Sequence, residues 1–187
     1  REFVLYWMQA SQRARFNHAL EYAARRADVL EVPLVVGFGL HAGYPEANAR
    51  HFAFMLQGLQ ETEAALRARG ITLAVRKAPP DDAALEFSHR ACMVVCDRGY
   101  LRHQRQWRER VADEADCRVV QVETDVVVPV ETVSDKEEYA ARTIRPKIHD
   151  LLVTATSARM SMWRQEAPRP SPRLLSHLIP PWPRPPS

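Results

Sequence analysis

The sequence predicts an α/β fold in which a doubly wound, five-stranded parallel sheet carries helices on both faces. Five short apolar runs alternate along the chain with segments whose apolar residues recur at helical spacing. Crossovers between parallel strands are almost always right-handed, and they place helices on both faces of the sheet. Several of the runs, such as FVLYWM at residues 3–8, contain no polar residue, which is typical of strands buried on both faces.

The five expected strands differ in how much they are buried. The run at 33–38 begins with Pro33, and the first position of a strand tolerates proline. The third run alternates apolar with polar residues, which predicts a half-buried strand. The expected strands span residues 3–8, 33–38, 71–76, 91–96 and 118–122.

Helical periodicity fills the intervals between these strands. Gly70 lies where the second helix should end, and Asp81 or Asp82 can cap a short third helix. After the fifth strand, Val126 to Val130 continues as an extended apolar segment. The apolar stripes of the four helices contain Phe16, Leu20, Ala23, Ala24 and Ala27; Phe52, Met55, Leu56, Leu59 and Leu66; Ala84, Leu85 and Phe87; and Trp107, Val111, Ala112 and Ala115.

A further helical pattern runs from Lys136 to Leu152, and Pro146 predicts a break in it. Ser134 with Glu137 three residues later fits a capping box at its start. The periodicity is lost beyond about Val153, where an Arg- and Pro-rich segment follows. We therefore expect an α/β domain at residues 1–133, a helical segment at 134–152 and an irregular tail at 153–187.

Composition limits the functional classes. Apolar residues make up 46% of the chain and charged residues 26%, as in ordinary globular domains. Three cysteines argue against a disulfide framework and favour a reducing, cytoplasmic location. No apolar run is long enough to span a bilayer, so no membrane partner is expected. The net charge of +3 belongs to the tail, because residues 1–150 carry a net −1 and residues 151–187 a net +4.

Motifs that carry chemistry are weak in this chain. Gly37, Gly39 and Gly43 form a loose glycine motif, which we weigh as a dinucleotide site against a plain flexible loop. Cys92 and Cys96 are expected on one face of a strand as buried, inert thiols. We expect no metal site and no catalytic residue. Arginines cluster around Trp107 and would bind phosphates or form a solvated helix face; they are Arg98, Arg102, Arg105, Arg108 and Arg110.

Three stretches together resemble class II cyclobutane pyrimidine dimer photolyases. The opening YWM-x-x-S-Q-R spans Tyr6 to Arg13, and an N-x-A-L pattern follows at Asn17 to Leu20. DRGYLRHQRQWRERV at Asp97 to Val111 is similar to a bacterial branch of the family. SDKEEYAARTIRPKI at Ser134 to Ile148 is the most specific match. The resemblance covers about residues 3–152.

The resemblance implies a Rossmann-like N-terminal α/β domain, followed in family members by a helical domain that holds FAD and most of the DNA-binding surface. Photolyases use light to split a flipped-out dimer, and many carry a deazaflavin or folate antenna in the N-terminal domain. This chain should bind no FAD by itself and should meet DNA through the missing domain alone. The antenna residues that we expect are Gln12, Arg13, Asp97 and Arg98.

Two other functions remain open at this stage. The same architecture serves standalone nucleotide-binding or small-ligand-binding modules. Alternatively, the chain is a truncated product with no role of its own, which would self-associate through an exposed surface at Lys136 to Leu152. The abrupt change after Leu152 suggests out-of-frame translation of a GC-rich sequence, and a natural short form is the competing explanation. We expect the helical domain to lie outside this chain, which ends at Ser187.

Overall fold

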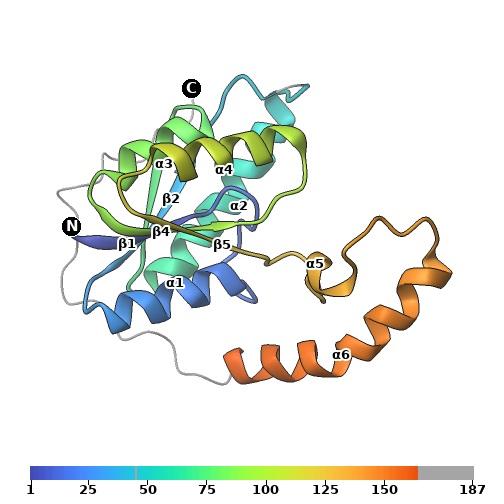
Figure 1. Ribbon diagram of the computed structural model, residues 1–187. Coiled ribbons are helices and arrows are strands. Elements are labelled where there is room, and N and C mark those ends of the chain that lie inside the picture. The colour runs from blue at the N-terminus through green and yellow to red at the C-terminus, as the bar shows by residue number, and fades with distance from the viewer. Residues whose placement is uncertain (45, 164–187) are drawn as a thin grey trace.

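A computed structural model of the chain, which describes residues 1–44 and 46–163, contains the expected five-stranded parallel sheet. Its strand order is β3-β2-β1-β4-β5, and every neighbouring pair is parallel (Figure 1). The chain winds outward in one direction from β1 to β3 and then returns to the other side of β1 for β4. The strands are β1 (Phe3–Trp7), β2 (Leu34–Gly39), β3 (Thr72–Arg76), β4 (Ala91–Asp97) and β5 (Arg118–Val122).

Helices cover both faces of the sheet and divide its core in two (Figure 1). Alternate residues of β1 point to opposite sides, because side chains alternate along a strand. Tyr6 and its neighbours pack with α1 and α2, whereas Trp7 packs with α3 and α4. The helices that cover the sheet are α1 (His18–Val29), α2 (Ala49–Arg67), α3 (Pro80–Ser88) and α4 (Arg102–Glu114).

The two cysteines of β4 lie on different faces of the sheet, so the expectation that they share one is wrong. Phe3 pairs with Ala91 and the next residue of β1 pairs with Met93, so Cys92 is an extra residue in β4. Such a bulge reverses the alternation of side chains beyond it. Cys96 is therefore buried with the α3 and α4 side, and Cys92 packs half-buried on the other side.

The glycines at the end of β2 serve packing and do not form a loop. A Cβ atom on Gly37 would lie 2.9 Å from side-chain atoms of Leu5 and Phe87. A Cβ atom on Gly39 would lie 2.7 Å from the Cα atom of Pro80, the first residue of α3. Both glycines thus let α3 approach the sheet closely, and the expectation of a flexible loop is wrong for them, because they belong to β2.

The segment after β5 differs from the expected helix in its start and its length. A short helix, α5 (Val130–Val133), begins at the residue where we expected an extended segment to end. The long helix α6 (Ala141–Trp163) then begins five residues after Lys136 and continues through Pro146. A proline near the start of a helix removes one hydrogen bond, and here it does not end the helix. No described helix is both long and apolar enough to cross a membrane.

Ser134 does not cap this helix but forms part of an ion-pair network. Its hydroxyl donates to Glu138 at 2.8 Å, and Lys147 of α6 donates to both Glu138 and Ser134. These bonds hold the turn against α6 and lower the pKa of Glu138 to about 2. Residues 153–163, expected as irregular tail, continue α6; the rest of the expected tail, 164–187, lies outside the described residues.

The packing of α3 predicts opposite effects for two glycine substitutions. Gly39→Ala should lower the free energy of unfolding by about 1–3 kcal/mol, because the new methyl group meets the backbone of Pro80. The control is Gly58→Ala in α2, where no atom lies within 4 Å of the new Cβ. That change should raise stability by about 0.5–1 kcal/mol. Urea denaturation measures both, and a Gly39→Ala protein as stable as the unchanged chain would refute the packing role.

Candidate functional site

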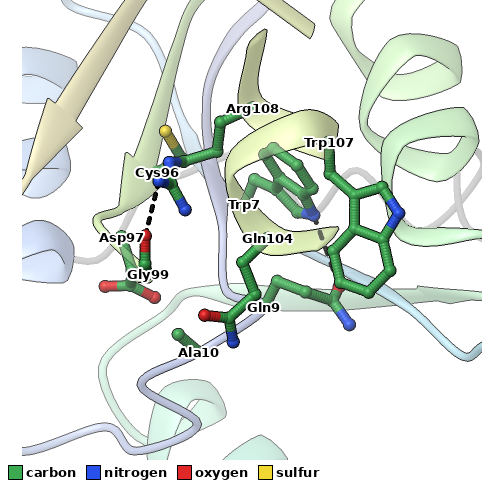
Figure 2. Close-up of a pocket in the computed structure, with 9 residues that line it drawn as sticks. All are labelled: Trp7, Gln9, Ala10, Cys96, Asp97, Gly99, Gln104, Trp107 and Arg108. Carbon is green, nitrogen blue, oxygen red and sulfur yellow. Dashed lines mark hydrogen bonds between the residues drawn. The ribbon is translucent and has the colours of Figure 1, made fainter. Parts of the chain in front are cut away.

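The reversal of strand order places a candidate site between the carboxyl ends of β1 and β4. In open parallel sheets, ligands bind at the carboxyl ends of two neighbouring strands whose following connections run to opposite edges of the sheet. The strands β1 and β4 are such a pair. A small pocket lies there (Figure 2). Its floor comes from the buried ends of the two strands, and its walls from the segment after β1 and from α4. The lining residues are Trp7, Gln9, Ala10, Cys96, Asp97, Gly99, Gln104, Trp107 and Arg108.

Gln9 fixes the wall that follows β1. Its amide nitrogen donates to the carbonyl of Gly39 at 3.1 Å, and its amide oxygen accepts from the Gly39 N–H at 3.1 Å. The indole N–H of Trp7 donates to the same oxygen at 3.3 Å (Figure 2). Three hydrogen bonds therefore tie the ends of β1 and β2 together and set the orientation of the Trp7 ring.

The opposite wall is one face of α4. Gln104, Trp107 and Arg108 stand three and four residues apart, so they lie on the same side of the helix. Arg108 donates through Nη2 to the carbonyl of Gly99 at 2.6 Å and through Nε to the side chain of Gln121 at 3.2 Å. A Cβ atom on Gly99 would lie 2.3 Å from Oε1 of Gln104, so the amide of Gln104 packs directly against this glycine.

A row of three contacting rings connects the rim of this wall with the loop after β2, and it consists of Trp107, His103 and Tyr44. The ring of His103 meets the ring of Trp107 edge-on, with 4.8 Å between the centroids. Tyr44 lies edge-on to His103, and its hydroxyl is 3.1 Å from Nε2 of that ring. Trp107 is thereby held by neighbours at the surface, while its other side faces the pocket.

Asp97 at the floor is the centre of a buried hydrogen-bond network. The hydroxyl of Tyr6 donates to its carboxylate at 2.9 Å, and the backbone N–H of Ser11 donates to it at 3.0 Å. Asn17 donates through Nδ2 to the Tyr6 hydroxyl at 2.9 Å and accepts from the N–H of Leu20 at the start of α1. The floor is thus held by hydrogen bonds that reach from β4 to α1.

Burial sets the protonation of the floor. Removal from water raises the pKa of the Asp97 carboxyl, although hydrogen bonds from Ser11 and Tyr6 act in the opposite direction. Burial also raises the pKa of the Tyr6 hydroxyl, and it raises the pKa of the Cys96 thiol to about 12. A thiol with such a pKa is protonated at neutral pH and is a poor nucleophile. The floor therefore supplies shape and rigidity and no reactive group.

Of the four residues expected to hold an antenna, Asp97 alone lines this pocket. Arg13 lies outside it and donates to Asp125 at 2.8 Å. Gln12 donates from its side chain to the Gln9 carbonyl and accepts at its own carbonyl from Thr62. Arg98 pairs with Glu131 of α5. The side chains of Gln12, Arg13 and Arg98 are thus engaged within the protein. The antenna roles of all four residues, Asp97 included, stay predictions.

The sequence interpretation missed most of the pocket walls, although two signals pointed to them. Gln9 comes directly after the first buried strand, at the edge where ligands bind. Gln104, Trp107 and Arg108 have the spacing of one helix face next to that edge. The expectation that Tyr6 and Trp7 belong to the core is confirmed, with 0% and 2% of their surfaces exposed.

The lining suits a flat, conjugated ligand with polar edges, because two indoles, two amides and a guanidinium converge on it. The pocket itself measures about 20 Å³, which is room for about one water molecule. A ring system would therefore need a wider pocket than this one. Beyond Gly99 and Arg108 the pocket adjoins an open groove of about 410 Å³. Among the described residues, no group of His, Cys, Asp and Glu side chains is placed to hold a metal ion.

Comparison with known proteins gives consistent matches to one family. A sequence model of the DNA photolyase family matches residues 4–172. The chain is 48% identical over 146 residues to a deoxyribodipyrimidine photo-lyase of Methanothermobacter thermautotrophicus, covering 78% of this chain and 33% of that protein. It is 39% identical over 152 residues to the enzyme of the same name from Potorous tridactylus, covering 79% of this chain and 29% of that protein.

One solved structure supports the same fold. An archaeal photolyase from Sulfolobus tokodaii superposes with a TM-score of 0.65 at 15% identity, over 79% of this chain and 34% of that one. The chain spans about a third of the length of the relatives it matches. The match to the family extends to residue 172, beyond the 152 that we expected. The change of pattern near residue 153 is therefore not the end of the family similarity.

The burial of Asp97 predicts a pH dependence of stability. Because the folded state raises the pKa of this carboxyl above its ordinary value of 3.8, the folded protein binds the proton more tightly than the unfolded chain. Its contribution to stability is therefore greatest below about pH 4 and falls as the pH rises through the folded pKa.

Urea denaturation of the unchanged chain and of Asp97→Asn across pH 4–7 tests this. The unfolding free energy of the unchanged chain, relative to the variant, should fall with increasing pH. Asp116→Asn, which changes an exposed carboxylate, corrects for the loss of one negative charge. A relative stability that stays constant or rises with pH would show that the carboxylate is not penalised by burial.

Proposed function

Because this chain belongs to the DNA photolyase family, we propose that it is the antenna-type N-terminal domain of a DNA photolyase. In this proposal the pocket between β1 and β4 holds a light-harvesting chromophore. The whole protein would use blue light and FAD to split cyclobutane pyrimidine dimers in DNA. The FAD site, the catalytic residues and the main DNA contacts would lie in the part of the protein outside this chain.

The observation that carries the proposal is the position and lining of the pocket. It lies at the strand edge where such sheets bind ligands, and Trp7 and Trp107 both line it. Conjugated chromophores have flat apolar faces, which pack favourably against indole rings. Their edges carry carbonyl and amide groups, which the side chains of Gln9 and Gln104 can meet with hydrogen bonds.

Each part of the site has a defined task in this proposal. The bound chromophore would absorb near-ultraviolet or blue light and pass the excitation to the flavin. Gln9, held by Gly39, keeps the Trp7 ring in one orientation, and the buried network around Asp97 keeps the floor rigid. Trp107 would cover the ring on the solvent side and exclude water. A fixed orientation matters because energy transfer depends on the angle between the two chromophores.

The identity of the chromophore is part of the proposal. The family resemblance suggests a deazaflavin or a folate. The structure of the Sulfolobus tokodaii photolyase contains two FAD molecules, and a novel light-harvesting cofactor was inferred for that protein. A flavin in the antenna position is therefore a third candidate, which replaces the expectation that this chain binds no FAD by itself. All three candidates share a flat conjugated ring with polar edges.

A titration of the chain with three compounds tests the proposal. We expect 8-hydroxy-5-deazariboflavin, methenyltetrahydrofolate or FAD to bind with a stoichiometry near one and to quench tryptophan fluorescence. Trp107→Ala should weaken that binding by about tenfold or more, because one flat wall is lost. Gln104→Ala, a change at the rim of the pocket, should weaken binding by a smaller factor, and it is the variant to use if Trp107→Ala folds poorly.

The control variant is Phe54→Ala, which removes an aromatic ring that is 80% exposed on α2. It should bind the chromophore as tightly as the unchanged chain. The proposal fails if none of the three compounds binds, or if Trp107→Ala and Gln104→Ala, with unchanged circular dichroism, bind as tightly as the control.

A further inference from the structure

An arginine groove adjoins the chromophore pocket on the side of β5. We define it by its charged and aromatic lining, which comes from the loop after β4, from α4 and from α5. Gly99 and Arg108 line both the groove and the pocket, so the two spaces are neighbours. The residues that define the groove are Arg98, Tyr100, Arg105, Arg108, Glu109 and Glu131.

Positive charge in this groove is not fully neutralised. Arg98 is paired with Glu131, and its guanidinium lies over the ring of Tyr100. Arg105 forms no ion pair with any residue that the structure describes. Arg105 and Arg108 therefore face the groove with Glu109 as the remaining carboxylate.

Arg108 is held in place yet has unused donors. A guanidinium carries five N–H groups, and Arg108 uses one at Nη2 for Gly99 and one at Nε for Gln121. These two bonds fix the plane of the group at the junction between the pocket and the groove. Burial lowers the pKa of Arg108, and the nearby charges of Arg98 and Arg105 act in the same direction. An anion at the junction would relieve this repulsion.

We propose that the arginine groove binds a phosphate group on the side chain of the chromophore, through Arg105 and Arg108. This inference rests on the proposed function, since it assumes that the ring lies in the pocket. The pocket measures about 20 Å³ and leaves no space for the side chain of a chromophore, whereas the groove beside it measures about 410 Å³. Guanidinium groups match phosphate oxygens in charge and geometry, often with two parallel hydrogen bonds.

A nucleic acid backbone suits this groove less well than one phosphate does. Glu109 and Glu131 line it, and residues 1–150 carry a net charge of −1. A polyanion gains affinity from many cationic contacts in a row. A single phosphate monoester needs the two guanidinium groups that the groove offers next to the pocket. The site would thus distinguish a phosphorylated chromophore from the same ring without its phosphate.

Two matched pairs of compounds test the inference on the full chain. One pair is 8-hydroxy-5-deazariboflavin and its 5′-phosphate, and the other is riboflavin and FMN. Fluorescence titration should show that the phosphorylated member of the pair that binds does so about tenfold more tightly or better. Arg105→Gln should remove most of this difference and leave the affinity for the unphosphorylated ring unchanged.

Arg50→Gln is the control, because Arg50 is an exposed arginine of α2 that lines neither the groove nor the pocket. It should keep the preference for the phosphorylated compound. Excess inorganic phosphate should weaken binding of the phosphorylated compound and not that of the bare ring.

The outcomes separate this inference from the proposed function. Equal affinity for both members of a pair overturns the phosphate site and is still consistent with the proposed chromophore pocket. A phosphate preference that survives Arg105→Gln also overturns it. If no ring compound binds, the proposed function fails and the inference fails with it. Binding of a single-stranded oligonucleotide that is lost in Arg105→Gln, without any phosphate preference among the chromophores, would assign the groove to nucleic acid instead.

Discussion

The hydrogen bond from Tyr6 to the buried Asp97 carboxylate is the interaction on which the rest of the site depends. It joins the ends of β1 and β4 at the point where the strand order reverses. Ser11 binds the same carboxylate, Asn17 binds the Tyr6 hydroxyl, and Thr124 after β5 accepts from the N–H of Ala19. A buried charge is tolerated where several donors meet it. One carboxylate thus positions the loop after β1, the start of α1 and the floor of the pocket.

The pocket combines this rigid floor with walls of two different kinds. Gln9 is fixed by its bonds to Gly39, whereas Gln104 and Trp107 are half-buried side chains on one face of α4. The arginine groove is continuous with the pocket, because Arg108 lines both of them. In the proposed function, the helix α4 would therefore contribute the residues that determine which chromophore is accepted.

Apolar periodicity predicted the strands, their parallel arrangement and the helices between them. A strand buried on both faces appears in the sequence as a continuous apolar run. The bulge at Cys92 left no such trace, since it depends on how β4 pairs with β1. Gly37 and Gly39 resembled a loop motif, and their role became clear from the close approach of α3. Asp97 was predicted at the site because it ends a strand. Gln104 and Trp107 were not predicted there, because helical spacing shows which residues share a face but not which strand end that face lies against.

The most direct test of the central claim follows the indole N–H signals of the four tryptophans in a ¹⁵N-labelled sample during chromophore titration. Two of them, Trp7 and Trp107, line the pocket, and the others, Trp163 and Trp182, lie far along the sequence after the sheet. If the chromophore binds between β1 and β4, the signals of Trp7 and Trp107 shift or broaden with saturation. Saturable binding that leaves Trp7 and Trp107 unchanged would contradict the account.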